Sequence, residues 1–336
     1  SKYILFSTDG VFVQATTSQA EFEESRGFFH ITEDKKDYVK KQRIKKIIDF
    51  FDDTSIKKVR IKGDFGENTN EWTIDIWEDI ENFLRMHIES PTHNRLKINF
   101  SSKANEGLYG FGEQLTYCNL KGRQVSILSQ EPGIGRGIQP LTWFINRSFG
   151  AGGNWTHSSS QAPLFISSEG RGFLCENYEF SNFDLTSPKQ ITYEIYASQM
   201  DLRLWHSQTP LELIEQLTRY TGRMPELPKW VDNGAIIGIQ GGTHRVRSFW
   251  TKLKKHDIPI AAFWLQDWVG QRRTSVGKQL WWNWELDEEH YPNWSDLQND
   301  FEKNDIAILG YINPFIVNPE EKGSFTRNLY EEAQSQ

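Results

Sequence analysis

The stretch DNGAIIGIQ at 232–240 is a nearly uninterrupted apolar run, and THRVRSFWTKLKKH at 243–256 follows it with apolar residues at helical spacing. IPIAAFWLQ at 258–266 is a second such run, and IAILGYINPFI at 306–316 is a third. Helical patterns follow these two runs in PNWSDLQNDFEKN at 292–304 and PEEKGSFTRNLYEEAQSQ at 319–336. Apolar strands joined by crossover helices are typical of a parallel sheet. We therefore expect residues 229–336 to form about the first three βα units of a (β/α)8 TIM barrel, an incomplete barrel.

The preceding region follows a different pattern. Short alternating or apolar runs are separated there by clusters of Gly, Pro, Asn and Ser, which is typical of an antiparallel β-sandwich. The clearest runs are KKVRIKGDF, RLKINFSS, QVSILS, APLFISSEGRGFLCEN and QITYEIYAS. Residues 211–220 have helical spacing after Thr209 and Pro210, so we expect a linker helix there. The sequence thus predicts a β-sandwich domain with its linker helix over 1–222. A helical patch at 77–88 is also considered, with a strand-flanking segment as its alternative.

Composition excludes several classes of partner. The net charge is −7 and no long basic run is present, so we expect no nucleic-acid partner. No apolar run is long enough to span a bilayer, so we expect no membrane partner. Two cysteines fit neither a disulfide framework nor a zinc site, and no metal or cofactor is expected. Four N-x-S/T sequons slightly favour secretion over a cytoplasmic location, which the sequence leaves open.

Polar residues follow the predicted barrel strands at the point where each strand ends. Gln240 ends the first strand, Gln266 and Asp267 end the second, and Asn313 ends the third. In such barrels the chemistry lies at the carboxyl ends of the strands. We therefore expect Gln240, Gln266 and Asp267 to contact a ligand, although strand-end amides can simply cap loops. For Asn313 both alternatives stay open.

The segment after Asp267 is expected to be a long loop rich in tryptophan and positive charge. Aromatic residues make up 14% of the chain, which suits either stacking on sugar rings or core packing. Trp281, Trp282 and Trp284 lie within four positions, so at least one is expected to line a sugar subsite, with Trp284 packing the loop instead. Arg272, Arg273 and Lys278 are also present. They suit an anionic sugar or aglycone, and a solvated surface is the alternative for the two arginines.

The order of these motifs resembles one branch of a known family. GIQGG, FWLQDW, GKQLWWNW, YPNW and YINPF follow one another, and YGFGEQLTYCNLKGR at 109–123 and EPGIGRG at 131–137 precede them. This series resembles the sulfoquinovosidase branch of glycoside hydrolase family 31. The resemblance implies a retaining α-glycosidase with an N-terminal β-sandwich and a (β/α)8 catalytic barrel.

The resemblance also implies roles for individual residues. Gln240 and Gln266 match residues near the hydroxyls or sulfonate of the sugar in the −1 subsite. Trp282 matches a tryptophan whose indole N–H binds the sulfonate. Glu131 and Lys278 match positions near the aglycone.

One substrate-binding position departs from that branch. Gln279 stands where the branch has an arginine, so a charge-assisted hydrogen bond becomes a neutral one. We therefore expect a poor sulfoquinovosidase, and a neutral glucoside or galactoside becomes an alternative substrate.

The catalytic carboxyls are expected outside this chain. Retaining glycosidases use two carboxyl groups about 5–5.5 Å apart. The resemblance places both on later barrel strands, and no matching D-F-G-E-like run follows YINPF. We expect the chain alone to be inactive and to require a complementary C-terminal chain or the remaining half of the same protein, with homo-oligomers also possible. The alternative is a non-catalytic carbohydrate-binding or structural protein that reuses the fold.

Overall fold

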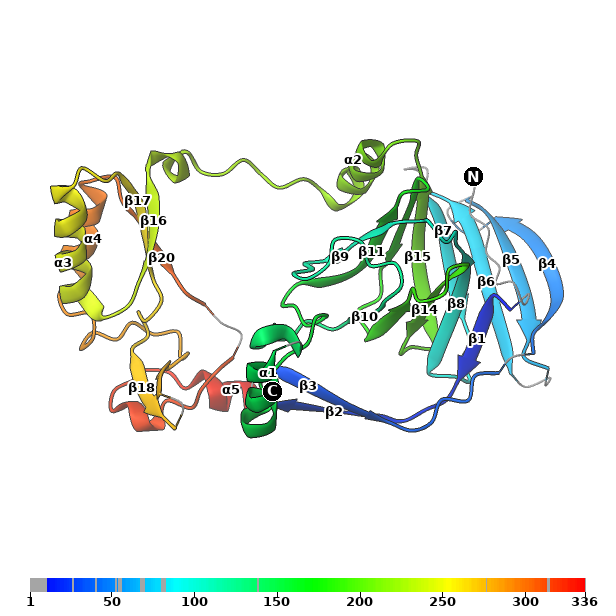
Figure 1. Cartoon of the computed structure of the whole chain (residues 1–336), viewed down its shortest axis with the longest axis horizontal. Helices are drawn as coiled ribbons and strands as arrows, with labels where there is room; N and C mark the ends of the chain where they lie inside the picture. The colour runs from blue at the N-terminus through cyan, green and yellow to red at the C-terminus, as the bar shows by residue number, and fades with distance from the viewer. Residues whose placement is uncertain are drawn as a thin grey trace. The chain divides into compact units, whose positions relative to one another are not determined.

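The computed structural model divides into two compact units, Ser1–Arg223 and Met224–Gln336 (Figure 1). The structure describes residues 11–25, 27–39, 41–51, 53, 56–66, 70–79, 83–137, 139–275, 277–312 and 315–335. The sequence predicts that the first domain ends at 222 and that the second begins at 229.

The first unit contains two large antiparallel sheets. Five strands form one sheet in the order β1 (Val13–Thr16), β8 (Arg95–Ser101), β14 (Gln190–Ile195), β13 (Ser181–Asp184) and β10 (Gln124–Ile127). Eight strands form the other in the order β4 (Arg43–Phe51), β5 (Lys57–Asp64), β6 (Glu71–Glu78), β7 (Leu84–Glu89), β15 (Gln199–His206), β12 (Arg171–Cys175), β11 (Gln161–Ser167) and β9 (Leu108–Gly112). A separate hairpin pairs β2 (Ala20–Ser25) with β3 (Phe28–Glu33). The strands expected from the alternating patterns are therefore present.

Both sheets contribute to one apolar core. Phe173 on β12 lies with its ring centroid 5.4 Å from that of Phe183 on β13 and 5.1 Å from that of Tyr193 on β14. All three side chains are buried. Every second residue of a strand points to the same face, so the inward faces of the two sheets supply this core in alternation.

Two segments of the first unit differ from the sequence-based expectation. The suggested helix at 77–88 is absent from the described part of that segment, because β6 and β7 pair there with Trp77 opposite Arg85. Alternate residues of these strands, such as Met86 and Ile88, enter the core, so a period of two prevails over helical spacing. An unexpected helix, α1 (Pro140–Phe149), follows a single 3-10 turn, η1 (Gly135–Gly137).

The expected linker helix is confirmed as α2 (Pro210–Thr221). Thr209 and Glu212 form a capping box at its start, in which the Thr209 side chain accepts from the Glu212 N–H and the Glu212 side chain accepts from the Thr209 N–H. Leu213 is buried, and its carbonyl accepts a hydrogen bond of 3.1 Å from the indole N–H of Trp205. The helix is therefore anchored to β15, the last strand before it.

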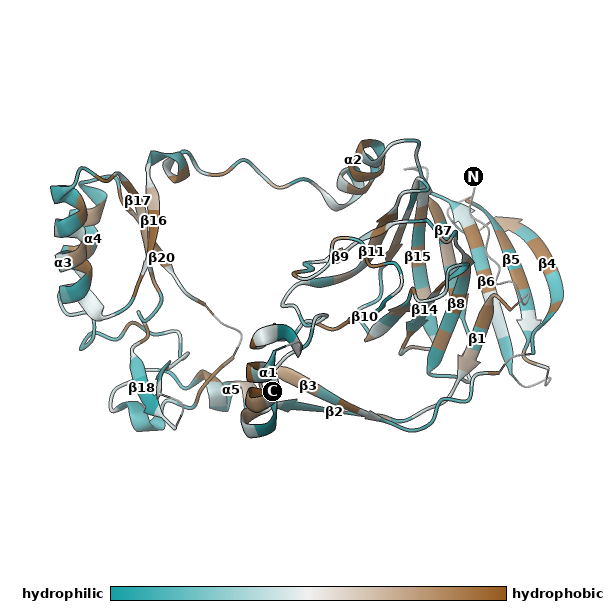
Figure 2. Ribbon diagram, in the orientation of Figure 1, coloured by the Kyte–Doolittle hydropathy of each residue, from teal (hydrophilic) through white to brown (hydrophobic). Residues whose placement is uncertain are grey.

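The second unit has a parallel three-stranded sheet with the order β16 (Ala235–Ile239), β17 (Ile260–Leu265) and β20 (Ala307–Gly310). Helices α3 (Gly242–Lys255) and α4 (Trp294–Glu302) pack on it, as the sequence predicted. Phe263 of β17 stacks on Phe301 of α4 at 5.0 Å, and Trp250 of α3 contacts the same ring at 5.0 Å. Figure 2 shows the hydrophobic strands beside the more hydrophilic α3. On the other face of the sheet Ile236 remains 43% exposed.

The segment between β17 and α4 is more ordered than a loop. It contains an antiparallel hairpin of β18 (Gln271–Thr274) and β19 (Gly277–Leu280). The remaining short elements of the unit are η2 (Lys229–Asn233), η3 (Glu320–Lys322) and α5 (Leu329–Ser335). Sequence reasoning missed this hairpin because its strands are short and polar, so apolar periodicity gives no signal.

One of the four sequons is inaccessible in the folded chain. Asn99 is 3% exposed, and its side-chain oxygen accepts hydrogen bonds from Gln190 and Thr192. Asn146, Asn154 and Asn293 are exposed.

None of the helices in the described ranges combines the length and apolar character that crossing a membrane requires.

Candidate functional site

The two glutamines predicted at neighbouring strand ends contact each other. Gln240 follows β16 and Gln266 follows β17, and these strands are parallel neighbours. The side-chain N–H of Gln240 donates to Oε1 of Gln266 at 2.7 Å. Because parallel strands place their carboxyl ends on one edge, the sequence pattern was sufficient to bring these amides together.

Asp267 is fully buried, and its carboxylate is surrounded by donors. Oδ1 accepts from the Tyr291 hydroxyl at 2.6 Å. Oδ2 accepts from the Gly241 N–H at 2.7 Å and from Gln271 Nε2 at 2.9 Å, and it lies 2.6 Å from His290 Nε2. Oδ2 therefore has three contacts and Oδ1 has one, so most of the accepting capacity of the carboxylate is used. The geometry suits a residue that positions the loops around the site, and the predicted ligand contact of Asp267 stays a prediction.

The partners of Asp267 come from a loop that returns to the strand ends. Tyr291 is buried, and burial together with its hydrogen bond to Asp267 raises its pKa above the ordinary range. Gly242 has a φ of +74°, and a Cβ there would lie 2.1 Å from the carbonyl oxygen of His290. Glycine at this position therefore lets the loop approach the start of α3 closely.

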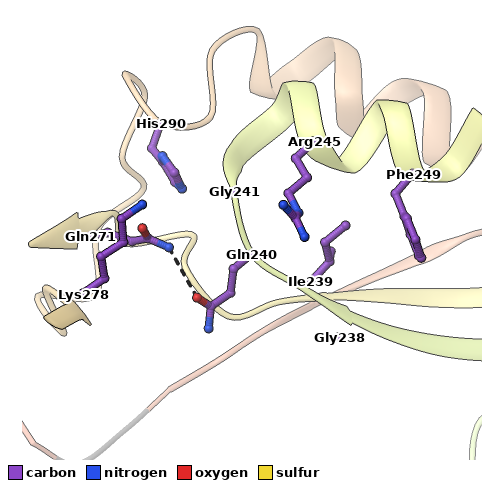
Figure 3. A pocket seen from close by; sticks show the side chains of 9 residues that line it. All are labelled: Gly238, Ile239, Gln240, Gly241, Arg245, Phe249, Gln271, Lys278 and His290. Atoms are coloured by element: carbon purple, nitrogen blue, oxygen red, sulfur yellow. Dashed lines mark hydrogen bonds between the residues drawn. The ribbon is translucent and has the colours of Figure 1, made fainter.

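A chain of amide hydrogen bonds leads from Asp267 to the strand ends. Gln271 Nε2 donates to Asp267 and also, at 3.3 Å, to Oε1 of Gln240 (Figure 3). Gln240 in turn donates to Gln266. This order of donors and acceptors makes Oε1 of Gln266 an acceptor, and its Nε2 forms no hydrogen bond with any residue that the structure describes. Sequence reasoning missed Gln271, because a single glutamine in a polar loop has no distinctive signal.

A cavity of about 550 Å³ borders these groups. Gln240, Gln271, Lys278 and His290 line it together with Arg245 and Phe249 of α3, as Figure 3 shows. The exposed side chain of Lys278 therefore borders the same cavity as Gln240. The predicted aglycone role of Lys278 stays a prediction.

Gln279 lies on β19, directly opposite Arg272 on β18. The guanidinium Nη2 of Arg272 is 3.5 Å from Oε1 of Gln279, and Nε donates to the carbonyl of Leu280 at 3.3 Å. Arg272 is half-buried, whereas Arg273 is exposed. Both arginines line a second cavity of about 450 Å³, so ligand contact and a solvated surface stay open for both.

Trp282 has an indole N–H without a partner. Its Nε1 atom is buried and forms no hydrogen bond with any described residue. Its backbone has a φ of +49°, and its ring centroid lies 5.9 Å from that of Phe315. A buried unpaired donor is unfavourable, so a ligand acceptor at this N–H would stabilise the site. Trp281 is 8% exposed, and Trp284, which was expected to pack the loop, is 42% exposed.

Lys322 anchors the segment that carries Trp282. Its ammonium group donates to the carbonyl of Val269 at 2.9 Å and lies 3.5 Å from Oδ1 of Asn283 and 3.6 Å from Asp287. The side chain of Lys322 is only 5% exposed. Lys322 therefore joins the region after β20 to the loop after β17, although the sequence alone did not indicate this contact.

Glu131 belongs to the first unit. Its side chain is exposed, and its backbone N–H donates to the carbonyl of Gly27 at 2.8 Å. The predicted role of Glu131 beside the aglycone stays a prediction. Asn313, for which both alternatives were open, lies outside the described residues.

The second unit is a parallel βα sheet with amide side chains beside a cavity at the ends of its strands, which is where βα-barrel enzymes place their sites. Residues 227–336 match the glycosyl hydrolases family 31 TIM-barrel domain. The chain belongs to glycoside hydrolase family 31 and is similar to the sulfoquinovosidases of that family.

Two curated relatives and one solved structure illustrate this similarity. The sulfoquinovosidase of Escherichia coli strain K12 is 30% identical over 252 residues, covering 74% of this chain and 37% of the relative. The sulfoquinovosidase of Agrobacterium fabrum strain C58 is 30% identical over 236 residues, covering 70% and 35%. A family 31 sulfoquinovosidase from E. rectale, solved with an aza-sugar inhibitor, has a TM-score of 0.84 at 30% identity, covering 96% of this chain and 48% of that structure. The chain thus spans half or less of each relative.

Proposed function

We propose that this chain forms part of a retaining α-glycoside hydrolase that acts on an α-linked hexoside. In this proposal an N-terminal β-sandwich precedes the first three βα units of a (β/α)8 barrel. Gln240 and Gln266 bind sugar hydroxyls, and Trp282 contributes its indole N–H. The two catalytic carboxyls lie outside residues 1–336.

The observation that carries the proposal is a pair of side-chain N–H donors that are available to a ligand, one at the strand ends and one in the loop after β19. The hydrogen-bond order from Asp267 to Gln266 leaves Nε2 of Gln266 as a donor, and Trp282 Nε1 is a buried donor without a partner among the described residues. Sugar hydroxyls and charged sugar substituents supply acceptors of the kind that such donors bind. Family membership and the similarity to sulfoquinovosidases support a glycosidase.

Asp267 is not the nucleophile in this proposal. Its carboxylate is fully buried and surrounded by four donors, three on Oδ2 and one on Oδ1, which would hold it in a fixed, enclosed position. The nucleophile and the acid are therefore expected on strands beyond β20.

The test uses the full-length protein and a panel of 4-nitrophenyl α-glycosides: sulfoquinovoside, glucoside, galactoside and xyloside. We expect turnover of at least one α-hexoside, with the first released sugar observed by NMR in the α configuration. Release of the β anomer would rule out the retaining mechanism. Sugar binding detected by calorimetry without any turnover would instead favour a non-catalytic carbohydrate-binding protein.

A further inference from the structure

We propose that Gln271 is a positioning residue that fixes the strand-end amides of Gln240 and Gln266 with their N–H groups towards a ligand. The site therefore requires a hydrogen-bond acceptor, such as a hydroxyl oxygen, and rejects a group that can only donate, such as an ammonium group. This inference rests on the proposed function and deepens it, because it states which substituent on a sugar the two amides recognise.

The polarity of the amide chain begins at a donor that cannot be reversed. The backbone N–H of Gly241 lies 2.7 Å from Oδ2 of Asp267. A backbone N–H can only donate, so Oδ2 is an acceptor. The group of Gln271 that lies 2.9 Å from the same oxygen is therefore its NH2. The opposite orientation would bring two acceptor oxygens together beside a fully buried carboxylate, which is unfavourable.

The same nitrogen transmits this polarity to the strand ends. Nε2 of Gln271 also lies 3.3 Å from Oε1 of Gln240, as the dashed line in Figure 3 marks. Gln240 thus directs its oxygen to Gln271 and its nitrogen to Oε1 of Gln266, at 2.7 Å. An amide has one carbonyl oxygen and one NH2 group, so fixing one end fixes the other. The groups that remain for a ligand are the NH2 of Gln266 and the second N–H of Gln240.

The amides lead from an enclosed carboxylate to an open cavity. Asp267 is fully buried, Gln271 and Gln266 are half-buried, and Gln240 is exposed. Gln240 and Gln271 line the cavity of about 550 Å³. The backbone N–H of Gly270 donates to the carbonyl of Asp267 at 2.9 Å, so a tight turn holds Gln271 beside the carboxylate. The buried end of the chain therefore determines the orientation of its exposed end.

The cations beside the amides make a separate contribution. Lys278 and Arg245 line the same cavity and also disfavour an ammonium group. Their charges do not depend on the orientation of an amide, so replacing Gln271 leaves this contribution unchanged. A preference that changes with Gln271 therefore reports the orientation of the amides.

The test measures ligand binding by calorimetry in the full-length protein. The probe is the methyl 1-thio-α-glycoside of the hexose preferred in the panel above, or the glucoside if no hexoside is turned over. Each ring hydroxyl is replaced in turn by an amino group, at a slightly acidic pH that keeps the amino group protonated. For at least one position we expect the wild type to bind the hydroxyl form at least tenfold more tightly than the amino form.

Replacing Gln271 should change this preference. Gln271→Met removes the donor that fixes the amides, so Gln240 and Gln266 can turn an oxygen towards the ligand. We expect the preference to fall at least fivefold, through tighter binding of the amino form. Gln271→Lys presents only donors to Asp267 and Gln240, so the preference should stay within twofold of the wild type. Gln298→Met replaces an exposed glutamine on α4 and is the matched control, with no change expected.

Gln271→Asn is the second variant if Gln271→Met does not fold, because its shorter amide cannot reach both acceptors and should lower the preference in the same way. A wild type without a preference at any position, an unchanged preference in these variants, or equal weakening of both ligands would overturn the positioning role. The expected dependence on Gln271 without any turnover would overturn the proposed hydrolase and leave this inference standing. Failure to bind any hexoside would overturn both.

Discussion

Gln271 donates through one side-chain nitrogen to both Asp267, at 2.9 Å, and Gln240, at 3.3 Å. A buried carboxylate thereby controls the orientation of an amide at the strand ends. Asp267 acts on the site through this chain of amides, because the carboxylate itself is enclosed. This arrangement separates the amides that we propose contact a ligand from the carboxylate that orients them.

The first prediction concerns the buried carboxylate. Asp267→Asn introduces an NH2 group among four donors, so at least one donor loses its acceptor. We expect the free energy of unfolding of the second unit to fall by about 2–4 kcal/mol in denaturant titrations of the full-length protein. Tyr291→Phe removes a single hydrogen bond and serves as the comparison, with an expected loss of about 1 kcal/mol. A smaller loss for Asp267→Asn than for Tyr291→Phe would contradict the structural role.

The second prediction concerns the indole of Trp282. Trp282→Ala should weaken sugar binding by about 1–3 kcal/mol, because a buried donor and a ring contact are lost. Trp282→Phe keeps an aromatic ring but lacks the N–H, so this variant should lose only part of that binding free energy. Sugar affinity can be measured by calorimetry with the full-length protein. Unchanged affinity in both variants, with the fold intact, would assign Trp282 to packing.

Lys322→Met is expected to loosen the loop that carries Trp282. The change removes a buried ammonium group from Val269 and Asp287 and leaves the carboxylate without its cation. We expect a loss of about 2–3 kcal/mol in unfolding free energy and faster amide hydrogen exchange in residues 281–287. Lys303→Met, at an exposed cation after α4, is the control. Equal exchange rates in the wild type and Lys322→Met would contradict the anchoring role.

A pH prediction follows from His157 in the first unit. Burial, with contributions from Arg136 and His30, lowers the pKa of His157 to about 4. In the unfolded chain an imidazole has a pKa of about 6.5. Between these values only the unfolded state gains a proton, so stability falls as pH drops from about 6.5 towards 4.

His157→Gln removes this titration. Because the side chain is half-buried and partly screened, the wild type should lose on the order of 1 kcal/mol more than the variant between pH 7 and pH 4.5. Urea unfolding at several pH values measures the difference. Parallel pH profiles for the two proteins would mean that His157 titrates normally in the folded state.

The last prediction concerns residues 1–336 expressed alone. Ile236 is 43% exposed on the sheet face opposite α3 and α4, and β16 and β20 each pair with one strand in the described part of the sheet. Exposed apolar faces and unpaired edges promote association. We expect no glycosidase activity and concentration-dependent aggregation by light scattering. A monodisperse monomer that hydrolyses α-glycosides would refute both expectations.

Local patterns in the sequence were enough to predict much of the fold. The parallel strands β16, β17 and β20 are short apolar runs, and the helices that follow show helical spacing, so each element carries its own signal. The meeting of Gln240 and Gln266 followed from the same logic, because neighbouring parallel strands end on one edge. The helix suggested by local spacing at 77–88 was wrong, because β6 and β7 pair in the described part of that segment.

The tertiary structure decided the remaining features of the site. Asp267 is polar and follows a strand, as a ligand-binding residue would, and its burial depends on His290 and Tyr291, more than twenty positions later in the chain. The contact of Arg272 with Gln279 depends on hairpin register, which short polar strands do not reveal. Sequence alone thus determined which residues end the strands, through local periodicity. Loop closure and cross-strand register, which join residues distant in sequence, determined which side chains are enclosed at the strand ends and which ones border the cavity.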